Sequence, residues 1–339
     1  MSKLTPASIL ISRNYHIFTK RHVFFAGNLQ DSLPGFLKTA QSFAHTQQYH
    51  HWQTLQPLLN KRVYYSLMIT RDMVSQCDTI IYFWPKNKRE ADFQLQNLLS
   101  LLPIGSDIFI VGENRSGVRG VEKIIIHSLN LKKIDNGCRS SLYQGTLNLN
   151  SSFNEKLFWN EYKINNIILK SLPGVFGFKG LDMGSQLLIS TLNKNINGKV
   201  LDVGCGTGVI SACLLSRSPQ VHLTLIDVNA AAIAASRATL LSNCFTGKVY
   251  CSNLYSNVNE RFHMIISNPP FHTGLKTNLE IAYKLIKDAP KFLYKHGELR
   301  IVANSFLPYP KILDDTFGNH QILAKNQSFK VYRSIKNLV

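Results

Sequence analysis

The sequence predicts an α/β protein with two tandem Rossmann-like domains, each built on a mostly parallel sheet that carries helices on both faces. Two observations support this class. Residues 199–271 contain four strands in succession, each followed by a loop or helix, and this pattern is typical of a parallel sheet. Residues 21–111 repeat part of the same succession. A chain of 339 residues is also long enough for two domains with separate cores.

The first strand of the second half, residues 199–203, leads into the glycine-rich loop 204–208 and then into a helix expected over 210–216. Glycines let the backbone turn sharply and come close to a ligand. Asp202 lies before the glycines, and the last glycine comes earlier than in the dinucleotide-binding fingerprint. Several nucleotide-binding folds use such a loop, so the strands that follow must show which of these folds is present.

The next two strands also end in polar side chains. The strand 223–226 ends at Asp227, whose carboxylate could accept hydrogen bonds from both hydroxyls of a ribose. An alanine-rich helix over 230–241 suits packing on a sheet. The strand 248–251 then ends near Asn253, where a polar group could meet the edge of an adenine.

The fourth strand, residues 264–267, runs into Asn268-Pro269-Pro270-Phe271. The two prolines fix φ and cannot donate hydrogen bonds to a neighbouring strand, so the strand must stop there. The Asn side-chain oxygen and a proline carbonyl could then accept hydrogen bonds from a planar amine, with the aromatic ring as its cover. An ordinary strand-ending turn would explain this tetrapeptide equally well if it stood alone.

The four features follow one another in the order of the strands, at the carboxyl edge where open α/β sheets bind ligands. This succession resembles the class I S-adenosylmethionine-dependent methyltransferases, and the Asn-Pro-Pro-Phe turn resembles their amine-methylating branch. Six further segments resemble the bacterial 16S ribosomal RNA guanine-N2 methyltransferases of the small-subunit methyltransferase C family, so the likeness covers nearly the whole chain. These segments are residues 44–52, 82–88, 112–119, 172–176, 180–188 and 297–304.

The resemblance implies two tandem Rossmann-like methyltransferase domains with mostly parallel seven-stranded sheets. It also implies methyl transfer from S-adenosylmethionine, without a metal, to N2 of a guanine in 16S rRNA within the 30S subunit. The implied acceptor-site residues are Asn268, Pro269, Pro270 and Phe271. The implied cofactor contacts are Phe176, Asp182, Gly184, Ser185, Asp202, Gly204, Cys205, Gly206, Gly208, Asp227, Val228, Asn253 and Leu254.

Two other function classes stay open at this point. An N-methyltransferase of another RNA, of DNA or of a protein glutamine could use the same turn. A non-catalytic RNA-binding protein is the other alternative, but it would be expected to have lost the glycine loop or Asn268, and both are intact.

The composition favours a polyanionic partner. The net charge is +18 and the isoelectric point is about 9.7, and basic side chains gain free energy by releasing counterions from phosphates. Compositional drift in a chain rich in Lys, Asn and Ile would explain part of this charge.

The cysteine pattern favours a cytoplasmic protein. Six cysteines include no C-x-x-C pair and no zinc spacing, so we expect them to be reduced.

No signal peptide and no apolar run of the ~20 residues of a membrane span are evident. His45, His50 and His51 lack the spacing of metal ligands on a helix. We expect a monomer, although no sequence pattern sets the oligomeric state.

The first half of the chain reads as a degenerate copy of the second. Residues 77–86 parallel residues 262–271, and residues 105–111 parallel the strand that begins near Gly297. Around Gly27 a single glycine stands in place of three, and Phe24 stands in place of the motif aspartate. Trp84-Pro85-Lys86 keeps the turn but has no Asn-Pro-Pro acceptors.

We therefore expect a degenerate domain over residues 1–155, with structural and RNA-binding tasks, and a catalytic domain over residues 156–339. Residues 147–156 read as a linker and residues 162–169 as the start of a strand pair. RNA contacts are expected from basic residues in the loops of the first half, although simple solvation explains each of them about equally well. These residues are Lys86, Lys88, Arg89, Arg115 and Arg119.

Overall fold

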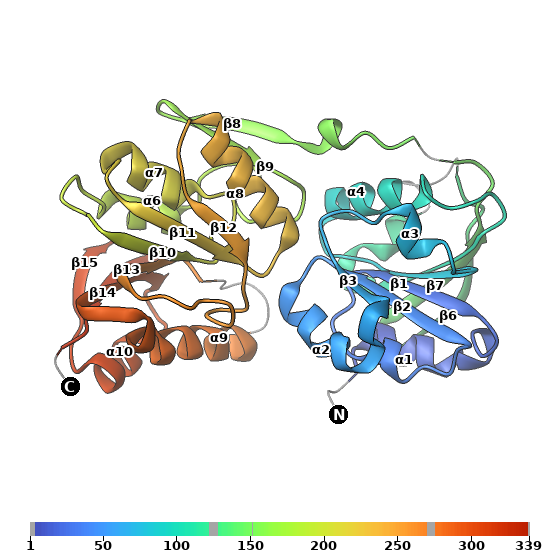
Figure 1. Cartoon of the computed structure of the whole chain (residues 1–339). Helices are drawn as coiled ribbons and strands as arrows, with labels where there is room; N and C mark the ends of the chain where they lie inside the picture. The colour runs from blue at the N-terminus through green and yellow to red at the C-terminus, as the bar shows by residue number, and fades with distance from the viewer. Residues whose placement is uncertain (1–3, 122–127, 151, 270–274, 338–339) are drawn as a thin grey trace. The chain divides into compact units, whose positions relative to one another are not determined.

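The computed structural model describes residues 4–121, 128–150, 152–269 and 275–337, with no side chains described for 275–278. The chain divides into two compact units, Met1–Phe158 and Trp159–Val339, each with its own sheet and core (Figure 1). The boundary lies shortly after the residue 155 expected from the sequence. Phe158 belongs to the first unit because its ring packs against Phe93, with centroids 5.2 Å apart.

The second unit contains a seven-stranded sheet in the order β12-β11-β10-β13-β14-β16-β15. The first five strands in this order are parallel, and β14–β16 and β16–β15 are antiparallel. The predicted mostly parallel sheet is therefore confirmed. The strands are β10 (Lys199–Val203), β11 (His222–Asp227), β12 (Lys248–Cys251), β13 (Phe262–Ser267), β14 (Leu293–Asn304), β15 (Gln321–Lys325) and β16 (Phe329–Ile335).

Helices cover both faces of this sheet because successive strand residues point to opposite sides. Val200 packs with one buried cluster, which includes helices α6, α7 and α8, and Leu201 packs with the other, which includes α9 and α10 (Figure 1). The helices are α6 (Met183–Ser190), α7 (Val209–Arg217), α8 (Ala230–Ser242), α9 (Leu275–Asp288) and α10 (Tyr309–Phe317). The sheet is thus the middle of three layers.

A hairpin opens the second unit, as the sequence predicts. Strands β8 (Asn160–Ile164) and β9 (Ile167–Ser171) pair in antiparallel register. Helix α8 holds the hairpin: the Thr239 hydroxyl accepts a hydrogen bond from the backbone N–H of Lys170 at 3.0 Å, and the Asn243 side chain accepts one from Ile168 at 2.9 Å.

The first unit repeats this architecture. Its sheet has the order β3-β2-β1-β4-β5-β7-β6, which is the order of the second sheet strand for strand. Helices α1 and α2 pack with one core cluster, and α3 and α4 pack with the other. The elements are α1 (Pro6–Arg13), β1 (His22–Gly27), β2 (Gln41–Thr46), α2 (Tyr49–Leu59), β3 (Val63–Tyr65), α3 (Arg71–Val74), β4 (Thr79–Phe83), α4 (Lys88–Leu99), β5 (Asp107–Glu113), β6 (Lys132–Gly137) and β7 (Ser140–Thr146).

The strand register corrects one detail of the repeat. Gly27 of β1 lies opposite Phe83 of β4. The preceding pair, Ala26 and Tyr82, corresponds to Val203 and Ser267 in the second sheet. Gly27 therefore corresponds to Gly204. The residue two positions earlier, Phe25 rather than Phe24, stands where the second unit has its motif aspartate.

Several element boundaries differ from the sequence expectation. Helix α4 begins at Lys88 rather than at residue 91, because the Asn87 side chain accepts hydrogen bonds from the N–H groups of Arg89 and Glu90 and caps the helix there. The helix expected over 279–293 is α9, which ends at Asp288, and a 3-10 turn containing Pro290 follows it. Residue 147, expected in a linker, is a fully buried leucine of the first core.

Candidate active site

The glycine loop follows β10 and leads into α7. Gly204, Gly206 and Gly208 have φ values of 76°, 55° and 77°, in the left-handed region that favours glycine. A Cβ at Gly204 would meet no atom within 4 Å, and a Cβ at Gly206 would meet only the Phe176 carbonyl oxygen at 3.5 Å. The backbone of this loop therefore borders open space that a ligand can enter.

Asp227 ends the neighbouring strand β11 and ties it to the loop. Its Oδ2 accepts a hydrogen bond from the Gly206 N–H at 3.0 Å, and its Oδ1 accepts one from the Asn229 N–H at 2.9 Å. Burial raises the pKa of Asp227, and these backbone donors oppose the shift. The residue as a whole is half-buried, as is Val228 beside it.

Asp202 is fully buried below the loop. Its Oδ2 accepts a hydrogen bond from the Ser211 hydroxyl of α7 at 2.5 Å, and its Oδ1 has no partner among the described residues. Burial raises the pKa of Asp202 to about 7. Since no part of this side chain reaches the surface, its effect on a cofactor would pass through the loop and α7.

Cys205 packs inside the loop. It is 5% exposed, and its sulfur accepts a hydrogen bond from the Ser236 hydroxyl at 3.2 Å. Burial raises the pKa of the thiol well above its usual value, so a nucleophilic thiolate is disfavoured.

The end of β12 is a tight turn. Leu254 has a φ of 50°, and its carbonyl oxygen accepts a hydrogen bond from the Ser252 hydroxyl at 2.6 Å. The Asn253 N–H donates to the Ser256 hydroxyl at 3.1 Å. Asn253 and Leu254 are half-buried at the carboxyl edge of the sheet, on the strand next to Asp227.

Asn268 ends β13 on the other side of the loop strand. Its Nδ2 donates to the Ser185 hydroxyl at 2.8 Å and is 3.3 Å from Asp182 Oδ1, whereas its own Oδ1 has no partner among the described residues. Pro269 is buried. Pro270 and Phe271, also expected at the acceptor site, lie outside the described residues.

Helix α6 carries the partners of Asn268. Asp182 is its N-cap and accepts a hydrogen bond from the Ser185 N–H at 3.0 Å. Gly184 leaves the space that this packing needs, because a Cβ there would lie 3.1 Å from Asp182 Oδ1 and 3.4 Å from the ring of Phe329. The resemblance implies cofactor contacts for Asp182, Gly184 and Ser185, and the structure places Asp182 and Ser185 in contact with Asn268, with Gly184 between them in the chain.

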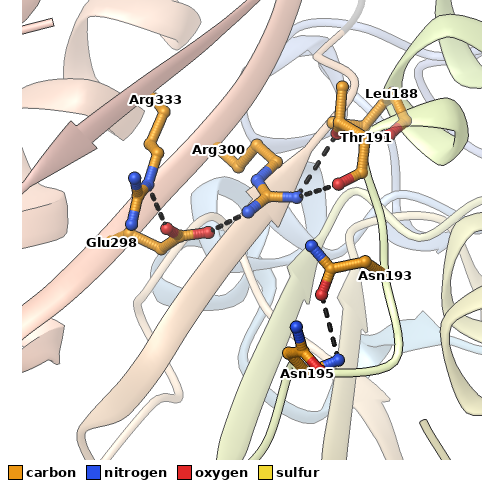
Figure 2. Close-up of polar contacts among 7 residues, drawn as sticks. All are labelled: Leu188, Thr191, Asn193, Asn195, Glu298, Arg300 and Arg333. Atoms are coloured by element: carbon orange, nitrogen blue, oxygen red, sulfur yellow. Dashed lines mark hydrogen bonds and ion pairs between the residues drawn. The ribbon is translucent and has the colours of Figure 1, made fainter. Parts of the chain in front are cut away.

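The other end of α6 is held by an ion network that sequence reasoning missed. Arg300 of β14 donates to the Thr191 carbonyl at 2.7 Å and pairs with Glu298 at 2.6 Å, and Glu298 also pairs with Arg333 of β16 (Figure 2). A cation at the last carbonyls of a helix also complements the helix dipole. Arg300 stands between Leu299 and Ile301, and Arg333 between Tyr332 and Ser334; no local pattern distinguishes the two arginines from solvent-facing charges.

Phe176 lies near the glycine loop. Its side chain is 52% exposed, and its carbonyl oxygen is the atom nearest to the open side of Gly206.

Replacing Gly204 by alanine should lower the affinity for S-adenosylmethionine by about tenfold or more, because the added methyl group occupies the open side of the loop. The matched control is Gly318→Ala. Gly318 has a φ of 72°, and a Cβ there also meets nothing within 4 Å. Both variants should lose a similar ~1–2 kcal/mol of stability from backbone strain. Calorimetric titration should show a weakened affinity in Gly204→Ala alone, and equal affinities would contradict this role of the loop.

The corresponding region of the first unit is filled by its own side chains. Tyr82 is fully buried and donates to Gln94 Oε1 at 2.8 Å, and Gln94 donates in turn to Gln47 Oε1 at 3.1 Å. A cavity of about 10 Å³ is left beside Gly27, which is room for about one water molecule. The side chains of Tyr82, Gln47 and Gln94 therefore fill most of the space beside Gly27.

We accordingly expect calorimetry to give a stoichiometry of one S-adenosylmethionine per chain. Gly204→Ala should reduce this binding without revealing a second site. A second binding event in the wild-type chain would contradict the interpretation of the first unit as a degenerate copy.

The five basic residues expected to contact RNA are all exposed. They lie after the carboxyl ends of β4 and β5, which are neighbouring parallel strands. They are Lys86, Lys88, Arg89, Arg115 and Arg119.

Metal binding has no support in the part of the chain that the structure describes, where no three His, Cys, Asp or Glu side chains are grouped as metal ligands. His45 is buried, bonds the Ser66 carbonyl at 3.0 Å, and has a pKa lowered by burial to about 4. His51 bonds the Asp31 carbonyl at 2.9 Å.

No helix among the described residues is long and apolar enough to span a membrane.

Similarity to known proteins agrees with this architecture. The methyltransferase small domain family matches residues 166–333, and the methyltransferase small domain N-terminal family matches residues 8–162. The chain is 56% identical over 337 residues to ribosomal RNA small subunit methyltransferase C from Erwinia tasmaniensis, a match that covers 99% of this chain and 98% of that protein. The counterpart from Klebsiella pneumoniae is 56% identical over 335 residues, with the same coverage.

One solved structure shares the fold of both units. It is described as T. thermophilus 16S rRNA N2 G1207 methyltransferase in complex with AdoMet and guanosine. It matches with a TM-score of 0.85 over 98% of this chain and 92% of that chain, at 19% sequence identity.

The doubled methyltransferase fold, with the glycine loop kept in one copy, defines an S-adenosylmethionine-dependent methyltransferase. Within that class, identity above one half over nearly the full length settles the family. The chain belongs to the ribosomal RNA small subunit methyltransferase C family.

Proposed function

We propose that this chain transfers a methyl group from S-adenosylmethionine to the exocyclic N2 of a guanosine in 16S rRNA. The proposed target is G1207, the nucleotide named for the T. thermophilus protein. The observation that carries the choice of an amine is Asn268 Oδ1 at the carboxyl end of β13, which has no hydrogen-bond partner among the described residues. Family membership supports ribosomal RNA as the substrate.

The chemical difficulty is that an exocyclic amine is a weak nucleophile, because its lone pair is delocalised into the ring. Asn268 Oδ1 accepts a hydrogen bond from this amine, and the Pro269 carbonyl accepts a second one. These two bonds favour a pyramidal nitrogen whose lone pair is available. S-adenosylmethionine supplies the electrophilic methyl group when bound. The residues of the chain therefore act by positioning and electrostatics, and Phe271 would stack on the base.

The cofactor contacts divide along the edge of the sheet. The backbone of the glycine loop holds the methionine part, Asp227 holds the ribose, and Asn253 with Leu254 holds the adenine. Phe176 closes the methionine end. The open space at Gly204 and Gly206 supports this assignment, as does the remaining exposure of Asp227.

A guanine in folded RNA must leave its stack before an enzyme can reach its amine. We infer that the substrate is 16S rRNA within the 30S subunit and that the enzyme acts as a monomer in the cytoplasm. The net charge of +18 supports an RNA partner.

The first unit is proposed to hold RNA through the edge that carries the five basic residues. Substituting Lys86, Lys88, Arg115 and Arg119 together by alanine should raise KM for 30S subunits and flatten its dependence on salt. Each lost phosphate contact lowers the slope of log affinity against log salt by about one. The charge-matched control replaces Lys20, Lys61, Lys132 and Lys133, which are exposed residues of the same unit away from that edge. Equal effects of the two quadruple variants would assign the binding to net charge alone.

Methyl transfer can be tested with radiolabelled S-adenosylmethionine and four acceptors: unmethylated 30S subunits, naked 16S RNA, plasmid DNA and ribosomal protein. The proposal expects label in 16S RNA, with 30S subunits as the better substrate. Label in DNA or protein alone would overturn it.

A further inference from the structure

We propose that Asp182 and Ser185 are positioning residues, which hold the Asn268 side chain in the orientation that turns its oxygen toward a substrate amine. The inference rests on the proposed role of Asn268 as the hydrogen-bond acceptor. It gives Asp182 and Ser185 a task different from the cofactor contact that the family resemblance implies.

The orientation of the Asn268 amide follows from the chemistry of its neighbours. A side-chain amide has one face that donates and one that accepts, and a half-turn about its last bond exchanges them. An ionised carboxylate such as that of Asp182 can only accept hydrogen bonds. The nitrogen of Asn268 must therefore face Asp182, at 3.3 Å, and it donates to the Ser185 hydroxyl at 2.8 Å.

The reverse orientation would bring the Asn268 oxygen against the carboxylate oxygen of Asp182. Both atoms accept, so they would repel one another. The observed orientation instead leaves Asn268 Oδ1 without a partner among the described residues. The site therefore presents an acceptor, which an amine can satisfy and a carbonyl oxygen cannot.

Helix α6 gives this pair a fixed position. Asp182 caps the helix by accepting from the Ser185 N–H at 3.0 Å, so both partners of Asn268 belong to one local motif. Ser185 is 3% exposed and has little freedom to turn away. At the far end of the helix, Arg300 holds the Thr191 carbonyl (Figure 2).

The test compares Ser185→Ala with Ser190→Ala. Ser190 lies in the same helix, is exposed, and bonds only the Leu187 carbonyl of its own turn among the described contacts. Three quantities are measured for each variant: kcat and KM with 30S subunits, cofactor affinity by calorimetry, and the side-chain amide NMR resonances of Asn268. The resonances are assigned by their loss in Asn268→Ala.

Ser185→Ala should lower kcat by about 10- to 100-fold, the scale of a small misplacement of a reacting group. KM and the cofactor affinity should stay within about threefold of the wild-type values, which is a smaller change than the tenfold that 1.4 kcal/mol produces. The Asn268 resonances should move. Ser185→Thr, which keeps the hydroxyl, should restore part of kcat. Asp182→Asn keeps an acceptor for the helix cap but can also donate, so it should disturb the Asn268 resonances while leaving the protein folded.

An unchanged kcat with unmoved Asn268 resonances in Ser185→Ala would overturn the inference. A fall in cofactor affinity that matches the fall in kcat would also overturn it, because Ser185 would then be a cofactor contact. The resonances report the orientation of Asn268 independently of activity. If Asn268→Ala were active, the proposed acceptor role would fail, whatever the resonances show.

Discussion

Replacing Asn268 by alanine should slow methyl transfer to 30S subunits by about 10³-fold, the upper range for removing one preorganised polar group from an active site. The substitution removes the acceptor Oδ1 and also the Nδ2 group that donates to Asp182 and Ser185. The affinity for S-adenosylmethionine should stay within a few-fold of the wild type, because the glycine loop, Asp227 and Asn253 belong to other strands. Single-turnover kinetics and calorimetry measure the two effects separately.

The control for this variant is Asn166→Ala. Asn166 is exposed in the turn between β8 and β9 of the same unit, and its loss should leave both rate and affinity unchanged. If cofactor affinity collapsed in Asn268→Ala while the fold was intact, Asn268 would be a cofactor ligand and the assignment of the amine acceptor would be wrong.

Replacing Glu298 by alanine should reduce the free energy of unfolding by about 3–5 kcal/mol, which is the usual loss when one member of a buried ion pair is removed. Glu298 is the shared anion of Arg300 and Arg333, with 12% of its side chain exposed, and Arg300 is only 7% exposed. Without Glu298, the Arg300 guanidinium would stay buried with no counter-charge. Urea denaturation measures the change.

Glu260→Ala provides a matched comparison. Glu260 also bridges two cations, Lys199 at 2.6 Å and Lys248 at 3.1 Å, but these lysines are 42% and 70% exposed. Surface ion pairs contribute about 0–1 kcal/mol, so this variant should lose little stability. Similar losses in the two variants would show that burial does not set the strength of the Glu298 network.

The Glu298 network also links stability to the site. It holds the end of α6 at Thr191, and the beginning of α6 holds Asn268. We therefore expect Glu298→Ala to reduce kcat even at temperatures where the protein is folded.

The sequence was sufficient for the succession of strands along the second unit and for the edge at which its motifs gather. The reason is that parallel strands place successive loops at one edge, so a local motif after each strand implies a shared site. Asp227, Asn253 and Asn268 could be placed in this way from strand ends alone.

The contacts around α6 could not be predicted in the same way. The bond between Asn268 and Ser185 joins residues 83 positions apart, and the bond between Arg300 and Thr191 joins residues 109 positions apart. Asp182 is the N-cap of α6, but nothing local in the sequence shows that this residue also contacts another strand. The alignment of Phe24 with Asp202 was wrong by one residue. Shifting this alignment by one position leaves the apolar pattern of the strand unchanged, so only the strand pairing across the sheet identifies the correct counterpart.

We propose that this site methylates the N2 amine of one guanosine in 16S RNA. The direct measurement is nucleoside mass spectrometry of 16S RNA after reaction with the purified chain, with the modified position mapped on the RNA. We expect N2-methylguanosine at G1207, the position named for the T. thermophilus protein, with the wild-type chain and none with Asn268→Ala. A methyl group on another base, or N2-methylguanosine formed equally well by Asn268→Ala, would contradict it.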